Sequence, residues 1–356
     1  MIRHALLVLL ATCLGHAAAS SAAVRQVIVT ASERGTYFRI GQDLARYVAP
    51  AADIDLVAAT SAGSVENVRR LRSEQGVKFA LVQSDVYQGY LDMAAAGNRA
   101  AAALVRPLRV ILPLYNEEIC FVVRADAPWS FVHEIRGARI NAGETGSGTA
   151  LTTATLYRLM FGQGLPDAGT TYLADEQALV RLVTDRSVDV VVIVGGQPTQ
   201  LLARMGPEAR QHVKLLRVDP GHGATKAALK TYFSATVRRD SYPNLLEADL
   251  PALAVRAFLV TYDFQSDHTE SAMRRFARSL CDNFASLKDQ GHPKWREVEV
   301  ALPQLGRGWS YYGPTSTELR KCRIRAATSS AKAAATPRPT AACSQQERLL
   351  GLCAAR

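Results

Sequence analysis

Long apolar runs are missing from this 356-residue sequence, and we therefore expect no membrane-spanning segment in the mature protein. A helix that crosses a bilayer needs about 20 apolar residues. The one marked apolar stretch lies within Met1–Leu14 and has about ten, the length found in signal peptides. Arg3 precedes it, and Ala17–Ala19 supplies a small-residue cleavage site. We expect residues 1–19 to be a signal peptide, cleaved near Ala19, and the mature protein to be soluble and periplasmic.

A lipid anchor is not expected. The segment Leu10–Cys13 resembles a lipoprotein box, but Thr12 is a poor residue directly before the cysteine. Cleavage at that point would also leave a shortened apolar segment.

Recognisable patterns of catalysis and metal binding are also missing. Ser147 does not lie in a nucleophile elbow, because Thr145 and Thr149 stand where that motif has glycine. The turn around Ser147 is not followed by the Gly-Lys-Ser/Thr of a phosphate-binding P-loop. The histidines beyond the first segment show no acid/base or metal spacing: His133, His212, His222, His268 and His292. We therefore expect no enzyme activity, no cofactor and no metal.

The net charge of +10 does not indicate a nucleic-acid-binding protein. One unit comes from Arg3, and the segment that begins at Arg323 contributes five. The remaining four units are spread over residues 20–322, which is too little for the basic footprint of a nucleic-acid site. The Ala/Thr/Ser/Pro-rich basic segment 323–356 is expected to be disordered.

Cysteine is scarce, with six residues in the whole chain. Cys120 lies in the apolar segment Ile119–Val123, where we expect a buried free thiol. Export permits disulfides. Two pairs are open candidates, Cys281 with Cys322 and Cys343 with Cys353, and the sequence alone does not decide either.

Strands and helices alternate along most of the chain. Apolar or alternating segments predict strands, and apolar positions three and four residues apart predict helices. Continuously apolar strands between helices are typical of parallel sheets covered on both faces. The expected strands are Val24–Thr30, Ile54–Ala58, Phe79–Val82, Ala138–Ala142 and Val188–Val194; the expected helices are Ile40–Val48, Ser64–Leu71, Leu151–Phe161, Glu176–Val183 and most of Leu253–Leu287.

The alternation of strands and helices occurs in two successive series along the chain, which predicts two α/β lobes. The segments Ile119–Arg124 and Tyr232–Val237 look like crossovers between them. We expect a discontinuous first lobe, 24–122 with 238–322, and a second lobe, 123–237. The cleft between the lobes is then the natural ligand site.

The stretch GETGSGTA, Gly143–Ala150, lies between an expected strand and an expected helix. Its glycine and hydroxyl residues present free backbone N–H groups, which suit an anion at a helix N-terminus. A plain helix cap and turn is the alternative. Four further loops lie at expected strand ends: Gly35–Tyr37, Thr60–Ser64, Gln83–Asp85 and Gly195–Pro198.

Several residues in these loops have two open interpretations. Gln83–Asp85 could contact a ligand or the opposite lobe, or could cap the helix that follows. Tyr37 could close over a ligand or pack on its own lobe. Tyr115 is a candidate for the cleft wall. Asn67 is expected to support the site from behind or face solvent, and Glu117 and Glu118 are expected to lie on solvated faces.

The order of these motifs resembles the TAXI proteins, the solute receptors of a class of TRAP transporters. The matching segments are Gly35–Gly41, Ser61–Asn67, Val82–Asp85, Leu114–Glu117 and Gly146–Thr149, and the likeness covers about residues 25–240. Ser-Val-Glu-Asn followed by Val-Gln-Ser-Asp is its most specific part.

The resemblance implies a two-lobed, type II periplasmic binding fold with two crossover strands. It implies a non-enzymatic, monomeric receptor that closes on a small carboxylate-bearing solute, an organic acid or amino acid, and delivers it to a TRAP permease. An exported sensor without transport is the alternative. The residues expected to bind the ligand are Thr36, Tyr37, Ser61, Ser64, Gln83, Asp85, Tyr115, Gly146, Ser147, Gly148, Thr149, Gly196 and Gln197.

Overall fold

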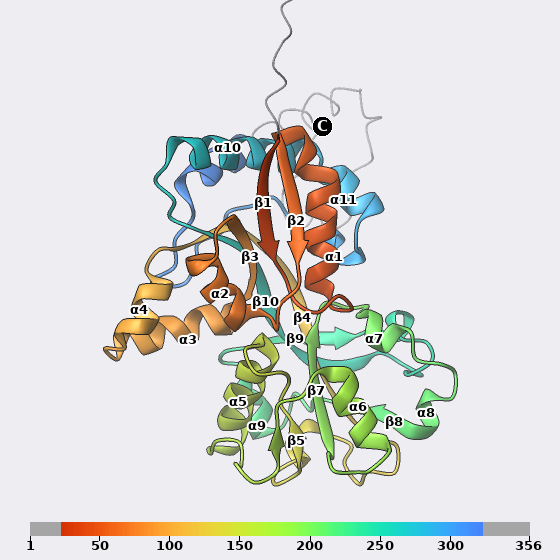
Figure 1. Cartoon of the computed structure of the whole chain (residues 1–356). Helices are drawn as coiled ribbons and strands as arrows, with labels where there is room; N and C mark the ends of the chain where they lie inside the picture. The colour runs from red at the N-terminus through yellow and green to blue at the C-terminus, as the bar shows by residue number, and fades with distance from the viewer. Residues whose placement is uncertain (1–22, 323–356) are drawn as a thin grey trace, which may run out of the picture.

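Two long antiparallel strands join the upper and lower halves of the molecule (Figure 1). They are β4 (Leu108–Arg124) and β10 (Leu250–Tyr262), which pair along most of their length. The computed structural model describes residues 23–322. The expected signal peptide, the basic C-terminal segment and the pair Cys343 and Cys353 lie outside these residues.

The first lobe has the strand order β2-β1-β3-β10-β4. Strands β1, β2 and β3 are parallel, and β10 is antiparallel to both β3 and β4. Its strands are β1 (Val24–Val29), β2 (Ile54–Ala59) and β3 (Val77–Gln83). Its helices are α1 (Thr36–Asp43), which a π-turn at Leu44–Val48 continues, α2 (Ser64–Ser73), α3 (Ser84–Ala95), α4 (Arg99–Val105), α10 (Asp267–Asp282) and α11 (Phe284–Gln290), followed by a 3₁₀ turn at Pro293–Glu297.

The second lobe continues the same sheet from β4 through β7, β5 and β6. Strand β8 pairs with the end of β4, and β9 pairs with the start of β10. Its strands are β5 (Ile140–Asn141), β6 (Thr170–Thr171), β7 (Val190–Gly195), β8 (Val213–Leu215) and β9 (Phe233–Val237). Its helices are α5 (Gly148–Phe161), α6 (Asp175–Val183), α7 (Gln200–Ala203), α8 (Ala209–His212) and α9 (Gly223–Ala228).

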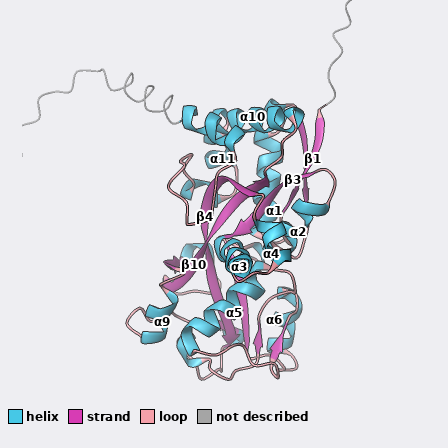
Figure 2. Ribbon diagram, turned by 90° about the vertical axis from the view of Figure 1, so that its left-hand side faces the viewer, coloured by secondary structure: helices cyan, strands magenta, loops and turns pink. Residues whose placement is uncertain are grey.

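Each lobe has a hydrophobic core on both faces of its part of the sheet. In the first lobe, α1 and α10 cover one face and α2, α3 and α4 cover the other. In the turned view, α3 and α4 lie in front of the sheet (Figure 2). Phe79 of β3 and Phe276 of α10 meet in the first of these cores with ring centroids 4.5 Å apart. Burial on both faces explains why the strands are nearly continuous apolar runs.

The two-lobed fold with two crossover strands is confirmed, but three details differ from expectation. The sheet is mixed rather than parallel, because β4 and β10 run through both lobes in opposite directions. The first part of Leu253–Leu287 is strand β10, whose buried apolar residues carry no periodicity that separates strand from helix. The segment Tyr232–Val237 contains β9, and the second crossover is β10. We therefore propose that the second lobe ends near residue 250.

The ladder between the crossover strands is irregular at the waist of the molecule. Its register shifts between Arg256 and Phe258, opposite Asn116 and Pro113, and again between Leu259 and Val260. Proline has no backbone N–H to donate to the ladder. The pairing is therefore interrupted where the chain passes from one lobe to the other.

One of the two candidate disulfides is confirmed. Cys281 in α10 is bonded to Cys322, the last residue that the structure describes. Cys120 is a buried free thiol, as expected, and burial raises its pKa to about 12. The disulfide fastens the C-terminal helical turns to α10 in the first lobe.

We predict that replacing both Cys281 and Cys322 by serine lowers the free energy of unfolding by about 4 kcal/mol, because the unfolded chain gains the freedom of a loop of this length. The cross-linked residues are 41 positions apart. Urea unfolding of the oxidised wild type and the double variant measures the difference. Equal midpoints would show that the bond contributes nothing to stability.

Candidate functional site

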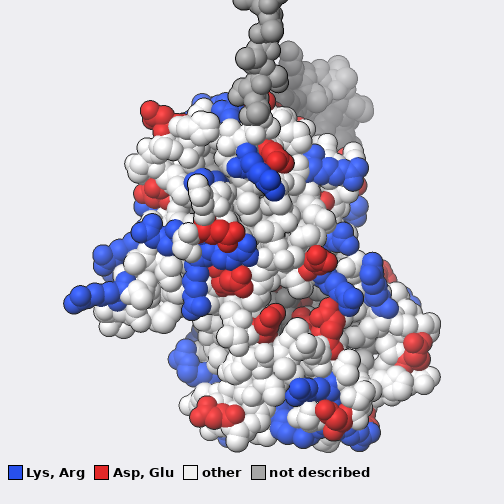
Figure 3. Space-filling model, viewed as in Figure 1, with Lys and Arg blue, Asp and Glu red and all other residues white. Residues whose placement is uncertain are grey.

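A cavity of about 110 Å³ lies between the lobes at the ends of several strands. Its wall combines the loops after β1, β2 and β3 with the turn before α5, the start of α6 and the end of β7. The face of the molecule in Figure 3 is hollowed at the waist, and acidic side chains gather around the hollow. Pockets for drug-sized ligands have volumes of about 300–1,000 Å³, so this one fits a small solute.

Four helices begin at the cavity. They are α1, α2, α5 and α6, and residues at their first turns line the wall. The first backbone N–H groups of a helix have no partner within it and carry a partial positive charge. The Ser147 side chain accepts a hydrogen bond from the Ala150 N–H, 3.0 Å, and so caps α5. This cap leaves the N–H groups of Gly148 and Thr149 for another acceptor.

The two lobes touch around this cavity. The Glu66 N–H of α2 donates to the Gly146 carbonyl, 3.0 Å, across the cleft. The Thr36 hydroxyl donates to the Gly196 carbonyl, 2.6 Å, and Arg34 forms an ion pair with Glu176 at 3.4 Å. The structure therefore has the lobes closed on each other.

The approach is tightest at Gly148. The side-chain amide of Gln83, from the first lobe, lies against the Gly148 Cα, and the Ser64 hydroxyl lies beside it. A Cβ atom at position 148 would collide with both. This contact explains why a residue without a side chain stands at the start of α5.

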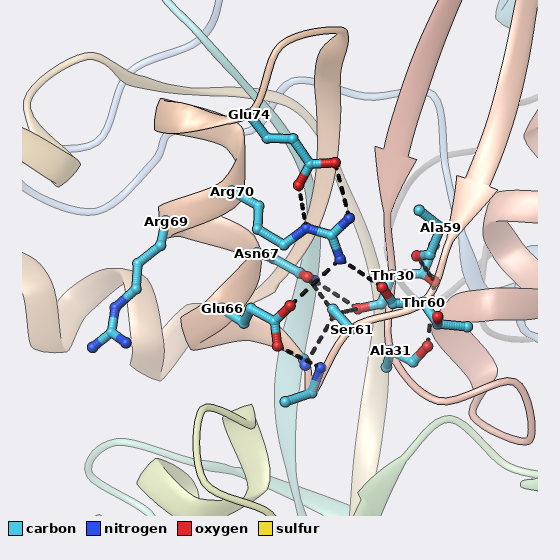
Figure 4. Close-up of polar contacts among 12 residues, drawn as sticks. Thr30, Ala31, Ala59, Thr60, Ser61, Glu66, Asn67, Arg69, Arg70 and Glu74 are labelled. Carbon is cyan, nitrogen blue, oxygen red and sulfur yellow. Dashed lines mark hydrogen bonds and ion pairs between the residues drawn. The ribbon is translucent and has the colours of Figure 1, made fainter.

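A hydrogen-bond network behind the cavity holds the loop Thr60–Gly63 in place (Figure 4). The Asn67 amide donates to the carbonyls of Thr30 and Leu81, at 2.6 and 2.7 Å, and its oxygen accepts from Ser61 at 2.6 Å. The Glu66 carboxylate accepts from the Ala62 N–H, 2.9 Å. Asn67 and Ser61 thus position the loop from behind the cavity wall.

Arg70 extends this network along α2. Its guanidinium donates to the Thr60 carbonyl, 2.6 Å, and pairs with Glu74 at 2.6 Å. In Figure 4 the neighbouring Arg69 points away from the loop. Arg70 therefore fastens α2 to the end of β2.

Glu117 and Glu118 are buried, and the expectation that they lie on solvated faces is wrong. Only 3% of Glu117 and 4% of Glu118 are exposed, because β4 passes through the centre of the sheet. Glu117 lines the cavity and accepts a hydrogen bond from the Tyr37 hydroxyl, 2.8 Å. Burial raises the pKa of Glu117 to about 8, against hydrogen bonds from Tyr37 and Gln83.

Glu118 belongs to a buried ion network beside the cavity. The fully buried Lys294 ammonium lies 2.6 Å from Glu118 and 2.8 Å from Glu297. The second Glu118 oxygen accepts from the Gln197 N–H, 2.9 Å. The network connects the C-terminal part of the first lobe, a crossover strand and a loop of the second lobe.

Gln197 and Tyr115 lie outside the cavity wall. The Gln197 side chain donates to the Thr236 carbonyl, 2.8 Å, and accepts from the Arg238 N–H, 2.7 Å. Tyr115 is buried against Gly196, where a Cβ would meet its ring. These residues support the loop that follows β7.

Asp85 contacts the opposite lobe, one of the interpretations that the sequence left open. Its carboxylate accepts from the Thr152 hydroxyl of α5, 2.6 Å, and from the Tyr232 hydroxyl, 3.0 Å. Burial raises its pKa, and these two hydrogen bonds oppose the shift. Asp85 lies outside the cavity wall and ties α3 to the second lobe.

The cavity thus brings together seven of the expected residues: Thr36, Tyr37, Ser64, Gln83, Ser147, Gly148 and Thr149. Ser61, Asp85, Tyr115, Gly146, Gly196 and Gln197 surround it without lining it. The wall also contains polar residues that were not among the expected ligand contacts: Arg34, Glu117, Glu144, Asp175, Glu176 and Thr199. Asp175 and Glu176 are the first two residues of α6, which follows the short strand β6. Two acidic residues at the start of a helix that follows a strand are the sequence feature that could have indicated these two wall residues.

Within residues 23–322, no three His, Cys, Asp or Glu side chains are grouped so that they could hold a metal ion. In the same part of the chain, no helix has both the length and the apolar character needed to cross a bilayer.

A comparison with known protein families identifies the family of this chain. The model of the NMT1-like family matches residues 28–303, well over half of the sequence. The chain belongs to the NMT1-like family. The match includes the whole cavity wall and both crossover strands.

Solved structures that resemble this NMT1-like protein are distant in sequence. A TctC solute-binding protein from Polaromonas is 14% identical, with 77% of this chain and 86% of that chain covered and a TM-score of 0.41. The periplasmic binding protein BugD is 13% identical, with 87% and 97% covered and a TM-score of 0.48.

The raised pKa of Glu117 predicts a pH-dependent stability. The folded protein retains a proton on Glu117 up to about pH 8, whereas the ordinary pKa of glutamate is 4.5. The free energy of unfolding should therefore fall as pH rises from about 5 to 8. In Glu117→Gln this fall should be smaller, because the amide does not ionise and still accepts from Tyr37.

Urea unfolding at pH 6 and pH 8 measures the difference for each protein. Glu247→Gln is the control, since that carboxylate is 84% exposed and pairs only with Arg210 at the surface. The control should match the wild type. An equal loss of stability in Glu117→Gln and wild type would show that Glu117 is not the source of the pH dependence.

Proposed function

We propose that this NMT1-like protein is an extracytoplasmic receptor that captures a small solute between its lobes and delivers it to a membrane transporter. The observation that carries the proposal is the cavity at which four helices from two lobes begin. Its wall offers the backbone N–H groups of Gly148 and Thr149 and the Thr149 hydroxyl as hydrogen-bond partners, whereas the hydroxyls of Thr36 and Ser64 already bond to Gly196 and Gln83. Such a wall suits the polar end of a solute, and closure of the lobes shields it from water.

An enzyme is less well supported by the same cavity. Its wall contains no histidine, cysteine or lysine among the described residues. Ser147 caps α5 and Ser64 accepts from the Gln83 N–H, so neither hydroxyl is paired with a base. A hydrolytic site would need such a pair.

A TRAP-type permease is the transporter that we propose as partner. The support for it is the order of the TAXI-like motifs in the sequence, several of which meet at the cavity wall. An exported, periplasmic location follows from the same proposal and from the expected signal peptide. The residues that we propose to contact the solute are those expected ones that line the cavity, and the six around it would hold the wall in shape.

In the proposed receptor, closure of the lobes brings Gln83 against Gly148, and a substitution at Gly148 tests this contact. Gly148→Ala places a methyl group where the end of the Gln83 side chain and the Ser64 hydroxyl lie, so Gln83 must leave this contact and we expect solute binding to be lost. A thermal-shift screen of organic acids and amino acids measures this, because a solute at 100 times its Kd stabilises a protein by about 2.7 kcal/mol.

Gly164→Ala is the matched control. Gly164 also lies in the second lobe, and a Cβ there meets no atom within 4 Å. We expect one chemical class to stabilise the wild type and Gly164→Ala alike, and to have little effect on Gly148→Ala. Stabilisation of Gly148→Ala to the same extent would refute closure at this contact, and a wild type that no solute stabilises would refute the receptor function.

A further inference from the structure

The cavity wall is rich in carboxylates for a site at which four helices begin. Glu144, Asp175 and Glu176 line it from the second lobe, and Glu117 lines it from β4. The one basic residue in the wall, Arg34, already pairs with Glu176. The charged side chains therefore give this wall an excess of acid, although its backbone N–H groups favour an anion.

Two of these carboxylates have no partner in the described part of the chain. No hydrogen bond or ion pair joins the side chain of Glu144 or Asp175 to another described residue. Desolvation, together with the nearby charges of Glu176 and Glu144, raises the pKa of Asp175 to about 7. Neighbouring carboxylates of this kind are stabilised when a cation binds between them.

A second, independent feature of the wall indicates a ligand with a hydrogen-bond donor. Gln83 is 3% exposed and lines the cavity, and its side-chain oxygen is buried without a hydrogen-bond partner. A buried acceptor without a partner costs about 1–3 kcal/mol. A carbonyl oxygen can only accept hydrogen bonds, so a ligand group that bonds to the Gln83 oxygen must carry N–H or O–H.

We propose that the cavity holds a solute with a protonated primary amine, bound by Asp175 and Glu144, and that this solute carries no net negative charge. The inference rests on the proposed receptor function and narrows its substrate class. A carboxylate or other acceptor on the same solute would take the free N–H groups of Gly148 and Thr149. The solute's remaining donors would satisfy the Gln83 oxygen.

The test uses matched pairs of small probes that differ in the amine. The purified full chain is titrated calorimetrically with alanine against propionate, 4-aminobutyrate against butyrate, and putrescine against 1,4-butanediol. We expect at least one amine to bind at least ten times more tightly than its amine-free partner. Equal or tighter binding of the amine-free partners would overturn this inference and leave the receptor function standing, whereas no binding by any probe would overturn both.

A pair of variants locates the amine. Asp175→Asn should weaken binding of the preferred amine about tenfold or more, the effect of losing one charge-assisted hydrogen bond. It should leave the weak binding of the amine-free partner unchanged, which a general loss of structure would not do. Asp167→Asn is the control, because Asp167 is an exposed acid of the same lobe outside the cavity wall. Equal affinity of Asp175→Asn and Asp167→Asn for the preferred amine would show that Asp175 does not bind the amine.

Discussion

The close approach of Gln83 to Gly148 is the constraint on which the geometry of the cavity depends. It joins the end of β3 in one lobe to the start of α5 in the other. Because the Gln83 side chain lies directly against the Gly148 backbone there, the four helix starts surround a small volume rather than an open groove. The hydrogen bond from Glu66 to Gly146 and the bonds of Asp85 to Thr152 and Tyr232 hold the same two surfaces together on either side.

The buried charges beside the cavity serve a different purpose from those in its wall. Lys294 is fully buried and satisfied by Glu118 and Glu297, so this network fixes how the loop after β7 meets the first lobe. A buried ion pair adds little net stability, because desolvation offsets much of the attraction. Its geometry nevertheless leaves one arrangement of the three segments that satisfies every charge. Glu144 and Asp175, by contrast, keep acceptors available at the cavity.

The sequence predicted the two lobes and most of their elements because apolar strands and amphipathic helices alternate with clear periods. It predicted the turn Gly143–Ala150 and the loops at Gly35, Gly63 and Gln83 because glycine and hydroxyl residues at strand ends have a local meaning. It misplaced Glu117 and Glu118, since their burial depends on β4 becoming the centre of a sheet that both lobes share. The first part of Leu253–Leu287 is strand rather than helix, because the buried apolar residues of β10 carry no period that separates the two.

The irregular ladder between β4 and β10 has a mechanical consequence. A shift of register is where two paired strands bend and twist most easily, and here it lies at the waist, opposite Pro113. Each lobe is stiffened by its own cores, so bending is concentrated in a few peptide units rather than spread over a flexible linker. In the proposed receptor this pivot lies close to the cavity, so a small rotation there would become a large displacement at the outer rims of both lobes.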